Sequence, residues 1–174
     1  MIKSTLVFFL TLNMTFCFSQ ELKQICITVD DLPLVSYGNN KLVFLQETTA
    51  KLSATFKKYH VPAIGFVNEH KLYHKGQLDS AKVELLDAWL NNGLDLGNHS
   101  FAHKDYNTTS FETYTNDIIK GEIVTKNLLT KHGQEMKYYR HPYLRAGDTK
   151  ASSDSLTSFL TEHGYVAAPV TIDN

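Results

Sequence analysis

The sequence is poor in cysteine, proline and glycine, with 2, 4 and 9 of these residues among 174. Two cysteines cannot build the disulfide framework that supports many small secreted domains. So little proline and glycine excludes a collagen-like or low-complexity chain. The chain also lacks an excess of either charge, since 17 lysines and arginines balance 18 aspartates and glutamates. This balance does not suggest a basic surface for nucleic acid. The 43% hydrophobic content is that of an ordinary folded domain.

The first twenty residues differ from the rest of the chain. Lys3 precedes an apolar stretch from Leu6 to Phe18, and the small residues Cys17 and Ser19 lie near its end. This order is typical of a secretory signal peptide, whereas the stretch is short for a membrane span and interrupted by threonine and asparagine. We predict a signal peptide over residues 1–20, a domain over residues 21–174, and secretion or export to the periplasm. An uncleaved membrane anchor is the alternative, and no later stretch predicts a stable span.

Apolar runs and helical patterns alternate along the remaining chain. Residues 25–29 form a continuous apolar run, which predicts a strand buried on both faces, with Cys26 as an inert core residue. Further strands are predicted at residues 61–67, 94–97, 136–139 and 165–172. Apolar residues at steps of three and four predict helices between them, over 42–59, around 83–90, from Thr109 to the glycine at 133, and from Asp154 to the glycine at 164.

This alternation predicts an α/β fold with a parallel sheet. An eight-unit (β/α) barrel usually needs about 250 residues. The chain has room for about five βα units at roughly 30 residues each. The sequence therefore predicts either a small open sheet or an incomplete barrel.

Polar residues that can bind metals or move protons follow the predicted strands. In parallel α/β folds the active site lies at the carboxyl ends of the strands. Those ends carry Asp30-Asp31, Asn68-Glu69-His70, Asn98-His99, Arg140-His141 and Asp173. Groups suited to metal binding and acid-base chemistry are therefore expected on one face.

The pair His99 and His103 has the spacing of two metal ligands. Over one helical turn this spacing would place both imidazoles on the same side. The adjacent carboxylates Asp30 and Asp31 repel each other, and a cation would offset that cost. Two histidines and one carboxylate would leave a zinc ion one open position for water. Surface histidines and an aspartate turn are the alternatives, but their position at neighbouring strand ends favours a metal site.

Residues 140–143, Arg-His-Pro-Tyr, combine a cation, a rigid proline and an aromatic ring. Arg140 could clamp a carboxylate through its planar guanidinium, or it could be a structural loop residue. The other histidines are predicted to lie at the surface or at helix ends. His132 and His163 each precede a glycine, where a cation suits the end of a helix.

Three of these segments together resemble the motifs of polysaccharide deacetylases of the NodB-homology type, carbohydrate esterase family 4. Residues 28–33, Thr-Val-Asp-Asp-Leu-Pro, resemble the first motif, residues 98–103 the second and residues 140–143 the third. Residues 170–174 resemble the start of the fourth. The resemblance covers roughly residues 24–174 and implies a distorted (β/α) barrel, usually of fewer than eight strands.

The resemblance also implies roles for the site residues. It implies a divalent metal, usually zinc, held by Asp31, His99 and His103. Asp30 would be the general base and Arg140 would orient it. The backbone N–H of Tyr143 would help to bind the oxyanion, and Asp173 falls in the fourth motif.

Two features depart from the family pattern. Leu32 stands where the first motif usually has glycine, which indicates a divergent subfamily. The sequence also stops inside the fourth motif, and the fifth motif, with the family's general-acid histidine, is absent. We therefore expect a deacetylase domain whose C-terminal part is missing.

The leading interpretation is a hydrolase that uses a divalent metal to remove N- or O-linked acetyl groups. It would belong to the enzymes that act on carbon-nitrogen bonds other than peptide bonds. Its substrate would be an acetylated glycan or a small acetylated sugar. A degenerate module that binds glycan or metal without catalysis is the main alternative. A hydrolase of a small amide outside sugar chemistry is another. No nucleic-acid partner is expected, and the sequence does not define the oligomeric state.

Overall fold

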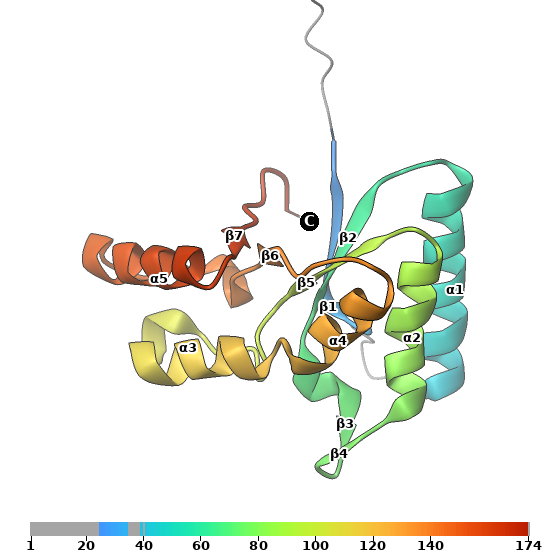
Figure 1. The fold of residues 1–174 in the computed structure, drawn as a ribbon, viewed down its shortest axis with the longest axis horizontal. Coiled ribbons are helices and arrows are strands. Elements are labelled where there is room, and N and C mark those ends of the chain that lie inside the picture. Colours follow the sequence, from blue (N-terminus) through green and yellow to red (C-terminus); the bar gives the residue numbers. More distant parts are fainter. Residues whose placement is uncertain (1–24, 35–38, 40, 174) are drawn as a thin grey trace, which may run out of the picture.

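Five parallel strands form one sheet in the computed structural model, which describes residues 25–34, 39 and 41–173 (Figure 1). The predicted signal peptide lies outside these residues. The strands, in their order across the sheet, are β1 (Ile27–Leu32), β2 (Ala63–Val67), β5 (Asp95–Asn98), β6 (Tyr138–Tyr139) and β7 (Val166–Ala167). Successive strands of the chain are neighbours, as in a segment of a (β/α) barrel. The predicted α/β fold with a parallel sheet is confirmed, and in the described residues β1 and β7 form its two open edges.

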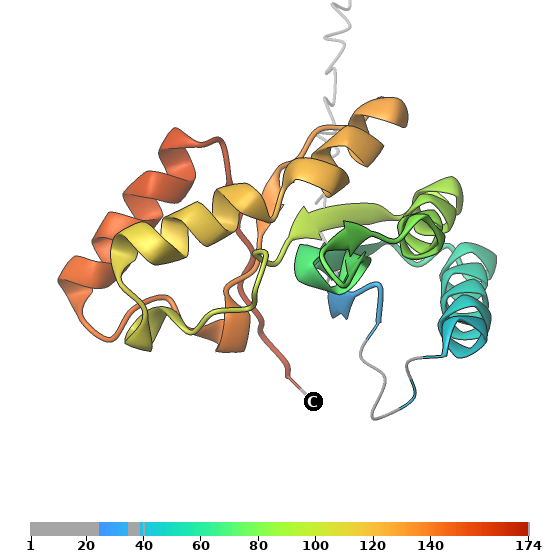
Figure 2. The ribbon, with the colours of Figure 1, turned by 90° about the horizontal axis from the view of Figure 1, so that it is seen from below.

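The helices form an arc around the sheet, and the C-terminal segment lies on the open side of that arc (Figure 2). Along the chain they are α1 (Leu42–Lys58), α2 (Ser80–Asn91), α3 (Phe111–Lys120), α4 (Ile123–Lys131) and α5 (Lys150–Glu162). Helix α2 packs between α1 and α4, and α3 packs against α5. None of the helices in the described ranges combines the length and hydrophobicity needed to cross a bilayer.

Short elements occupy the loops at the carboxyl ends of the strands. They are the 3₁₀ helices η1 (Glu69–Leu72), η2 (Tyr106–Thr108) and η3 (Pro142–Leu144), and the hairpin strands β3 (Tyr73–His74) and β4 (Gln77–Leu78). The hairpin was not predicted, because two-residue strands are too short to show an alternating pattern.

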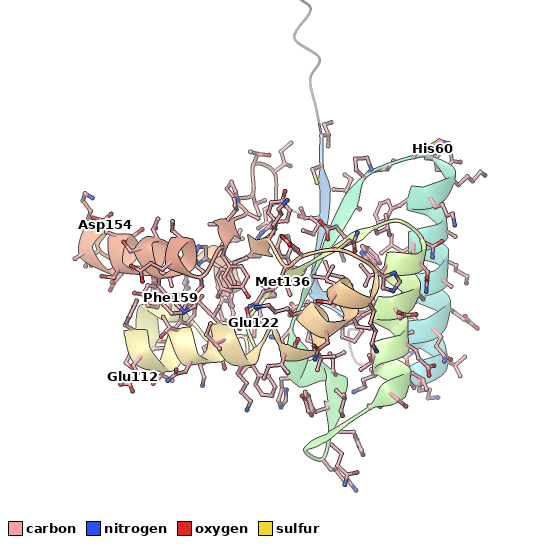
Figure 3. All side chains as sticks on the ribbon, in the orientation of Figure 1. His60, Glu112, Glu122, Met136, Asp154 and Phe159 are labelled. Carbon is pink, nitrogen blue, oxygen red and sulfur yellow. The ribbon has the colours of Figure 1, made fainter. Side chains whose placement is uncertain are left out.

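Two buried clusters hold the helices to the sheet. The first contains Trp89, Leu86 and Leu96 and joins α2 and α4 to β2 and β5. The second contains Tyr114, Tyr139 and Leu156 and joins α3 and α5 to β6. Met136 packs against both clusters (Figure 3). The two halves of the fold therefore share a continuous apolar interior.

The edge strands differ from the sequence prediction. Strand β1 begins at Ile27, and residues 25–28 are exposed, including Cys26. The prediction of a first strand buried on both faces, with Cys26 in the core, is wrong because β1 pairs with β2 alone. Leu32 at its end does reach the core, where it is 2% exposed. Strand β7 covers only Val166–Ala167 of the predicted range 165–172.

Several helices begin or end at other residues than the sequence predicts. Ser110, rather than Thr109, caps α3. The predicted long helix is two helices, because the chain turns at Gly121 between α3 and α4. Helix α5 begins earlier than predicted, since Thr149 and Ser152 form a capping box ahead of it. The predicted helix ends are confirmed at the glycines 133 and 164, which have φ of 70° and 77°, and Gly93, with φ of 77°, follows the end of α2 in the same way.

Glu69 ties the end of β2 to the start of α4. Its side chain is fully buried, and its Oε1 accepts hydrogen bonds from the backbone N–H of Thr125 at 2.7 Å and from the Thr125 hydroxyl at 2.9 Å. The carboxylate thus satisfies a first-turn N–H that has no partner within the helix. Burial raises the pKa of Glu69, against the opposing effect of these hydrogen bonds. Its backbone N–H donates to the carbonyl of Ser100, in the loop after β5.

Candidate metal centre

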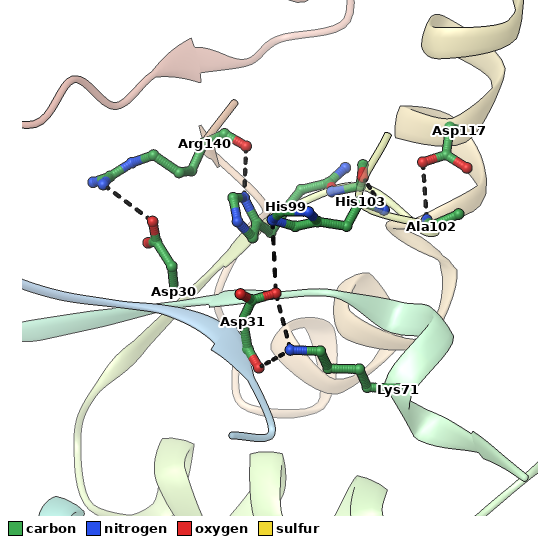
Figure 4. A network of polar contacts seen from close by, with 10 residues as sticks. Asp30, Asp31, Lys71, His99, Ala102, His103, Asp117 and Arg140 are labelled. Carbon is green, nitrogen blue, oxygen red and sulfur yellow. Dashed lines mark hydrogen bonds and ion pairs between the residues drawn. The ribbon is translucent and has the colours of Figure 1, made fainter. Parts of the chain in front are cut away.

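Asp31, His99 and His103 converge at the carboxyl ends of β1 and β5 (Figure 4). One potential ligand atom from each residue lies within 4.8 Å of the other two. The Nε2 of His103 is 3.8 Å from Oδ1 of Asp31. The structure therefore brings together the three residues for which the sequence predicts a metal site.

The two histidines lie on a tight loop rather than on a helical turn, so that part of the prediction is wrong. Ser100 and His103 have positive φ values of 63° and 51°. The Oδ1 of Asn98 accepts from the N–H of Ser100 at 2.7 Å, and the Oγ of Ser100 accepts from the N–H of His103 at 3.1 Å. This folding back of the loop places the His99 and His103 rings 4.9 Å apart between their centroids.

The last turn of α3 holds this loop in place. Phe101 donates its backbone N–H to the carbonyl of Asp117 at 3.0 Å, and Ala102 donates to the Asp117 carboxylate at 2.9 Å. Gly121 packs so closely that a Cβ there would lie 2.3 Å from the carbonyl carbon of Ser100. Neither Asp117 nor Gly121 was predicted from the sequence to support the site. The glycine was the available signal, since it falls inside an otherwise continuous helical pattern.

His99 is prepared to act as a neutral ligand. Its side chain is buried, and its Nδ1 lies 2.8 Å from the backbone carbonyl of Arg140. A carbonyl oxygen only accepts, so Nδ1 carries the proton and Nε2 keeps a free lone pair. Burial lowers the pKa of His99 to about 4, against the opposing effect of the Arg140 carbonyl. The ring is therefore uncharged at neutral pH.

Asp31 is prepared to act as an anionic ligand. The ammonium of Lys71 lies 2.9 Å from its Oδ1 and 3.1 Å from its backbone oxygen. Burial alone would raise the pKa of Asp31, but the hydrogen bond and charge of Lys71, with smaller effects of His103 and His99, lower it. Lys71 was missed, although the residues just before it were predicted to reach this face. Of those, Asn68 and Glu69 are buried, and His70 packs edge-on against Phe101.

Asp30 pairs with the buried Arg140, as the family resemblance implies. Nη1 of Arg140 lies 3.5 Å from Oδ2 of Asp30, and its Nη2 donates to the hydroxyl of Thr28 at 3.3 Å. The guanidinium also lies 4.6 Å above the ring of Phe66. Burial raises the pKa of Asp30, Arg140 opposes this effect, and the charge of Asp31 adds to it. Oδ1 of Asp30 is buried and has no hydrogen-bond partner among the described residues, so one oxygen is free to accept a proton.

The remaining predicted residues lie around this centre. Tyr143 has a positive φ of 56°, and its ring centroid lies 4.6 Å from that of His103. The negative charge of Asp173 lies close enough to raise the pKa of Asp30, after the larger effects of burial, Arg140 and Asp31. His141 packs edge-on against Tyr139, with 5.2 Å between the ring centroids. Its burial lowers the pKa of His141 to about 4.

Comparison with known proteins places this geometry in a family context. A family model described as polysaccharide deacetylase matches residues 19–167. The fold is similar to that of a polysaccharide deacetylase from Bacillus cereus, with 22% identity and a TM-score of 0.60 over 87% of this chain and 62% of that one. It is also similar to a family 4 carbohydrate esterase from Bacillus anthracis, with 25% identity and a TM-score of 0.54 over 82% of this chain and 56% of that one.

A family 4 pseudoenzyme from Bacillus anthracis is another similar structure, with 16% identity and a TM-score of 0.58 over 87% of this chain and 44% of that one. No match was found among curated proteins. The chain thus spans between 44% and 62% of the length of these three solved structures.

Gly121→Ala should weaken zinc binding, because the new Cβ forces the Ser100 backbone to move and carries the two histidines with it. Mutation of the groups that position metal ligands typically lowers metal affinity 10–100-fold, so we expect zinc affinity to fall at least about tenfold. Competition with a fluorescent chelator would measure it. Gly133→Ala is the matched control: its φ of 70° strains alanine, yet no atom crowds the Cβ. Equal zinc affinities in the two variants would show that α3 does not position the loop.

His141→Phe should make the metal-free protein less sensitive to acid. The folded-state pKa of His141, about 4, lies below its unfolded value, so its contribution to stability is complete above pH 6.5 and is lost as pH falls towards 4. In the wild type, His141 should lower the free energy of unfolding by up to about 1.4 kcal/mol per pH unit, and by about 2 kcal/mol between pH 6.5 and 4.5. The variant should not show this loss. Urea titrations at several pH values test this, with the exposed His60→Asn as control. Parallel stability curves for wild type and His141→Phe would refute the assignment.

Proposed function

The chain belongs to the polysaccharide deacetylase family, and from this premise we propose that it is a metal-dependent hydrolase that removes acetyl groups from a carbohydrate. The observation that carries the proposal is the convergence of Asp31, His99 and His103 within 4.8 Å. The substrate is an acetylated glycan or a small acetylated sugar, with the acetyl group linked through nitrogen or oxygen. A secreted or periplasmic location, expected from the leader pattern, is part of the same proposal.

Zinc is the metal that this donor set fits. Structures with catalytic zinc commonly use imidazole nitrogens and a carboxylate oxygen, three protein ligands in all, and keep one position open. The lowered pKa values of His99 and Asp31 leave the imidazole neutral and the carboxylate charged, as ligands must be. When bound, zinc would polarise the acetyl carbonyl and lower the pKa of a bound water.

Asp30 is the general base of the proposed reaction. Its free Oδ1 can take a proton from the attacking water, while Arg140 holds Oδ2. Burial raises the pKa of Asp30, which makes its carboxylate a better proton acceptor than an exposed aspartate. Arg140 is itself 2% exposed, so it contacts the partly exposed Asp30 from the protein interior. The proposal therefore gives the two adjacent aspartates different tasks.

Tyr143 is the proposed partner of the oxyanion that forms during attack. The packing of its ring against that of the candidate ligand His103, with 4.6 Å between the centroids, supports this role. A backbone N–H aimed at a developing negative charge commonly contributes several kcal/mol to transition-state stabilisation. Asp173 lies on the Asp30 side of the site, where its charge helps to keep the general base proton-accepting.

Replacement of each ligand by alanine, in Asp31→Ala, His99→Ala and His103→Ala, should remove most bound zinc while the chain stays folded. Zinc content after dialysis and far-UV circular dichroism would be measured together. The matched control is His132→Ala, since His132 pairs with Asp87 at 2.9 Å on another part of the surface. Hydrolysis of an activated acetyl ester, whose leaving group needs no general acid, should be lost with a chelator and restored by zinc. Unchanged zinc stoichiometry in all three variants would contradict the ligand assignment.

Asp30→Asn should separate chemistry from metal binding. The amide keeps the shape of the side chain but cannot accept the proton, so turnover of the acetyl ester should fall by about 10²–10⁴. Zinc content should stay at the wild-type level, whereas Asp31→Asn should lose both zinc and turnover. The ratio of zinc to protein in each variant decides between the roles. Loss of zinc from Asp30→Asn alone would reverse the assignment of the two carboxylates.

A further inference from the structure

A cavity of about 660 Å³ opens between the loops that follow β1 and β2, and Lys71, which contacts Asp31, is one of its lining residues. Its lining includes Pro33, Leu45, Lys71, Tyr73, His74 and Lys82. This volume lies within the range of small-molecule binding sites. The lining offers apolar and aromatic surface together with ammonium and imidazole groups, a combination that suits the carbon face and the polar substituents of a sugar.

Lys71 connects this cavity to the candidate metal centre. It lines the cavity, and its ammonium contacts Oδ1 of Asp31 at 2.9 Å (Figure 4). A molecule whose acetyl group lies at the metal ligands can therefore extend its remaining atoms into the cavity. The cavity is the natural place for the part of a substrate that is not hydrolysed.

Lys82 gives the cavity its charge. Its ammonium donates to the backbone carbonyl of Lys71 at 2.8 Å, which holds the side chain in place from the start of α2. Lys82 forms no ion pair with any residue in the described part of the chain, so two of its three donors are left for other partners. The acid in the lining, Asp79, is engaged by the backbone N–H of Ala81 at 3.1 Å. Lys82 thus presents an ammonium that has no ion-pair partner among the described residues, while the Asp79 carboxylate in the same lining caps α2.

From this geometry we infer that the cavity binds a carboxylate group carried by the acetylated sugar, with Lys82 as the specificity-determining residue. The inference rests on the proposed deacetylase function and narrows its substrate class to anionic acetylated sugars. A carboxylate near Lys82 forms a charge-assisted hydrogen bond, while the neutral part of the sugar packs on Tyr73 and Leu45.

N-acetylmuramic acid and N-acetylglucosamine form a suitable pair of probes, since the first carries a lactyl carboxylate and the second does not. Dissociation constants would be measured by NMR titration of the full chain at low salt, with 2-acetamido-2-deoxyglucuronic acid as a third probe for a ring carboxylate. The carboxylate sugar that fits should bind at least about tenfold more tightly than N-acetylglucosamine, a preference that 0.5 M salt weakens. The two acids distinguish a lactyl from a ring carboxylate as the source of the charge.

Lys82→Met should remove this preference, Lys82→Arg should keep most of it, and Lys131→Met, on the exposed last turn of α4, should leave it unchanged. Equal binding of all three sugars to the wild type, or no binding of any, would overturn the inference. Hydrolysis without a carboxylate preference would also overturn it while leaving the deacetylase proposal standing. A carboxylate preference that Lys82→Met removes would support the inference, even if hydrolysis were absent and the deacetylase proposal failed.

Discussion

The path of the chain between β5 and α3 is the constraint on which the candidate site depends. Asp31 is fixed by its place in β1, but His99 and His103 reach it because five residues fold back on themselves with two positive φ angles. Hydrogen bonds within the loop support this turn, and α3 stabilises it from outside. Asp117 binds two of its backbone N–H groups, and Gly121 allows the close approach. Packing of α3 and chemistry at the metal site are therefore coupled.

Buried charge is the second feature that joins structure to function. Arg140 and Glu69 are almost completely excluded from solvent. Arg140 pairs with Asp30 of the candidate site, and Glu69 accepts hydrogen bonds from Thr125 at the start of α4. Loss of the partner of a buried charge is destabilising, so Asp30 serves stability and chemistry at once. Asp30→Asn keeps the shape of the side chain and an oxygen that can accept from Arg140, whereas truncation would leave the guanidinium without either.

The sequence predicted the five strands of the main sheet, their parallel arrangement and the polar residues at the strand ends, because those features depend on local hydrophobic periodicity. It failed for β1, whose apolar residues lie at an open sheet edge, and for Cys26, which is exposed for the same reason. The break at Gly121 follows from a long-range contact with Ser100, which helix periodicity cannot reveal. Lys71 and Asp117 were not predicted, because their partners, Asp31 and Ala102, lie far from them in the sequence.

In the proposed site, the ends of β1 and β5 together bind one zinc ion through a carboxylate and two imidazoles. X-ray absorption at the zinc edge of the zinc-loaded protein can test this arrangement, since multiple scattering identifies imidazole rings. We expect a first shell of nitrogen and oxygen only, with two imidazoles that are both lost when His99 and His103 are replaced together. A shell that contains sulfur, or one whose imidazole signal survives that double replacement, would contradict it.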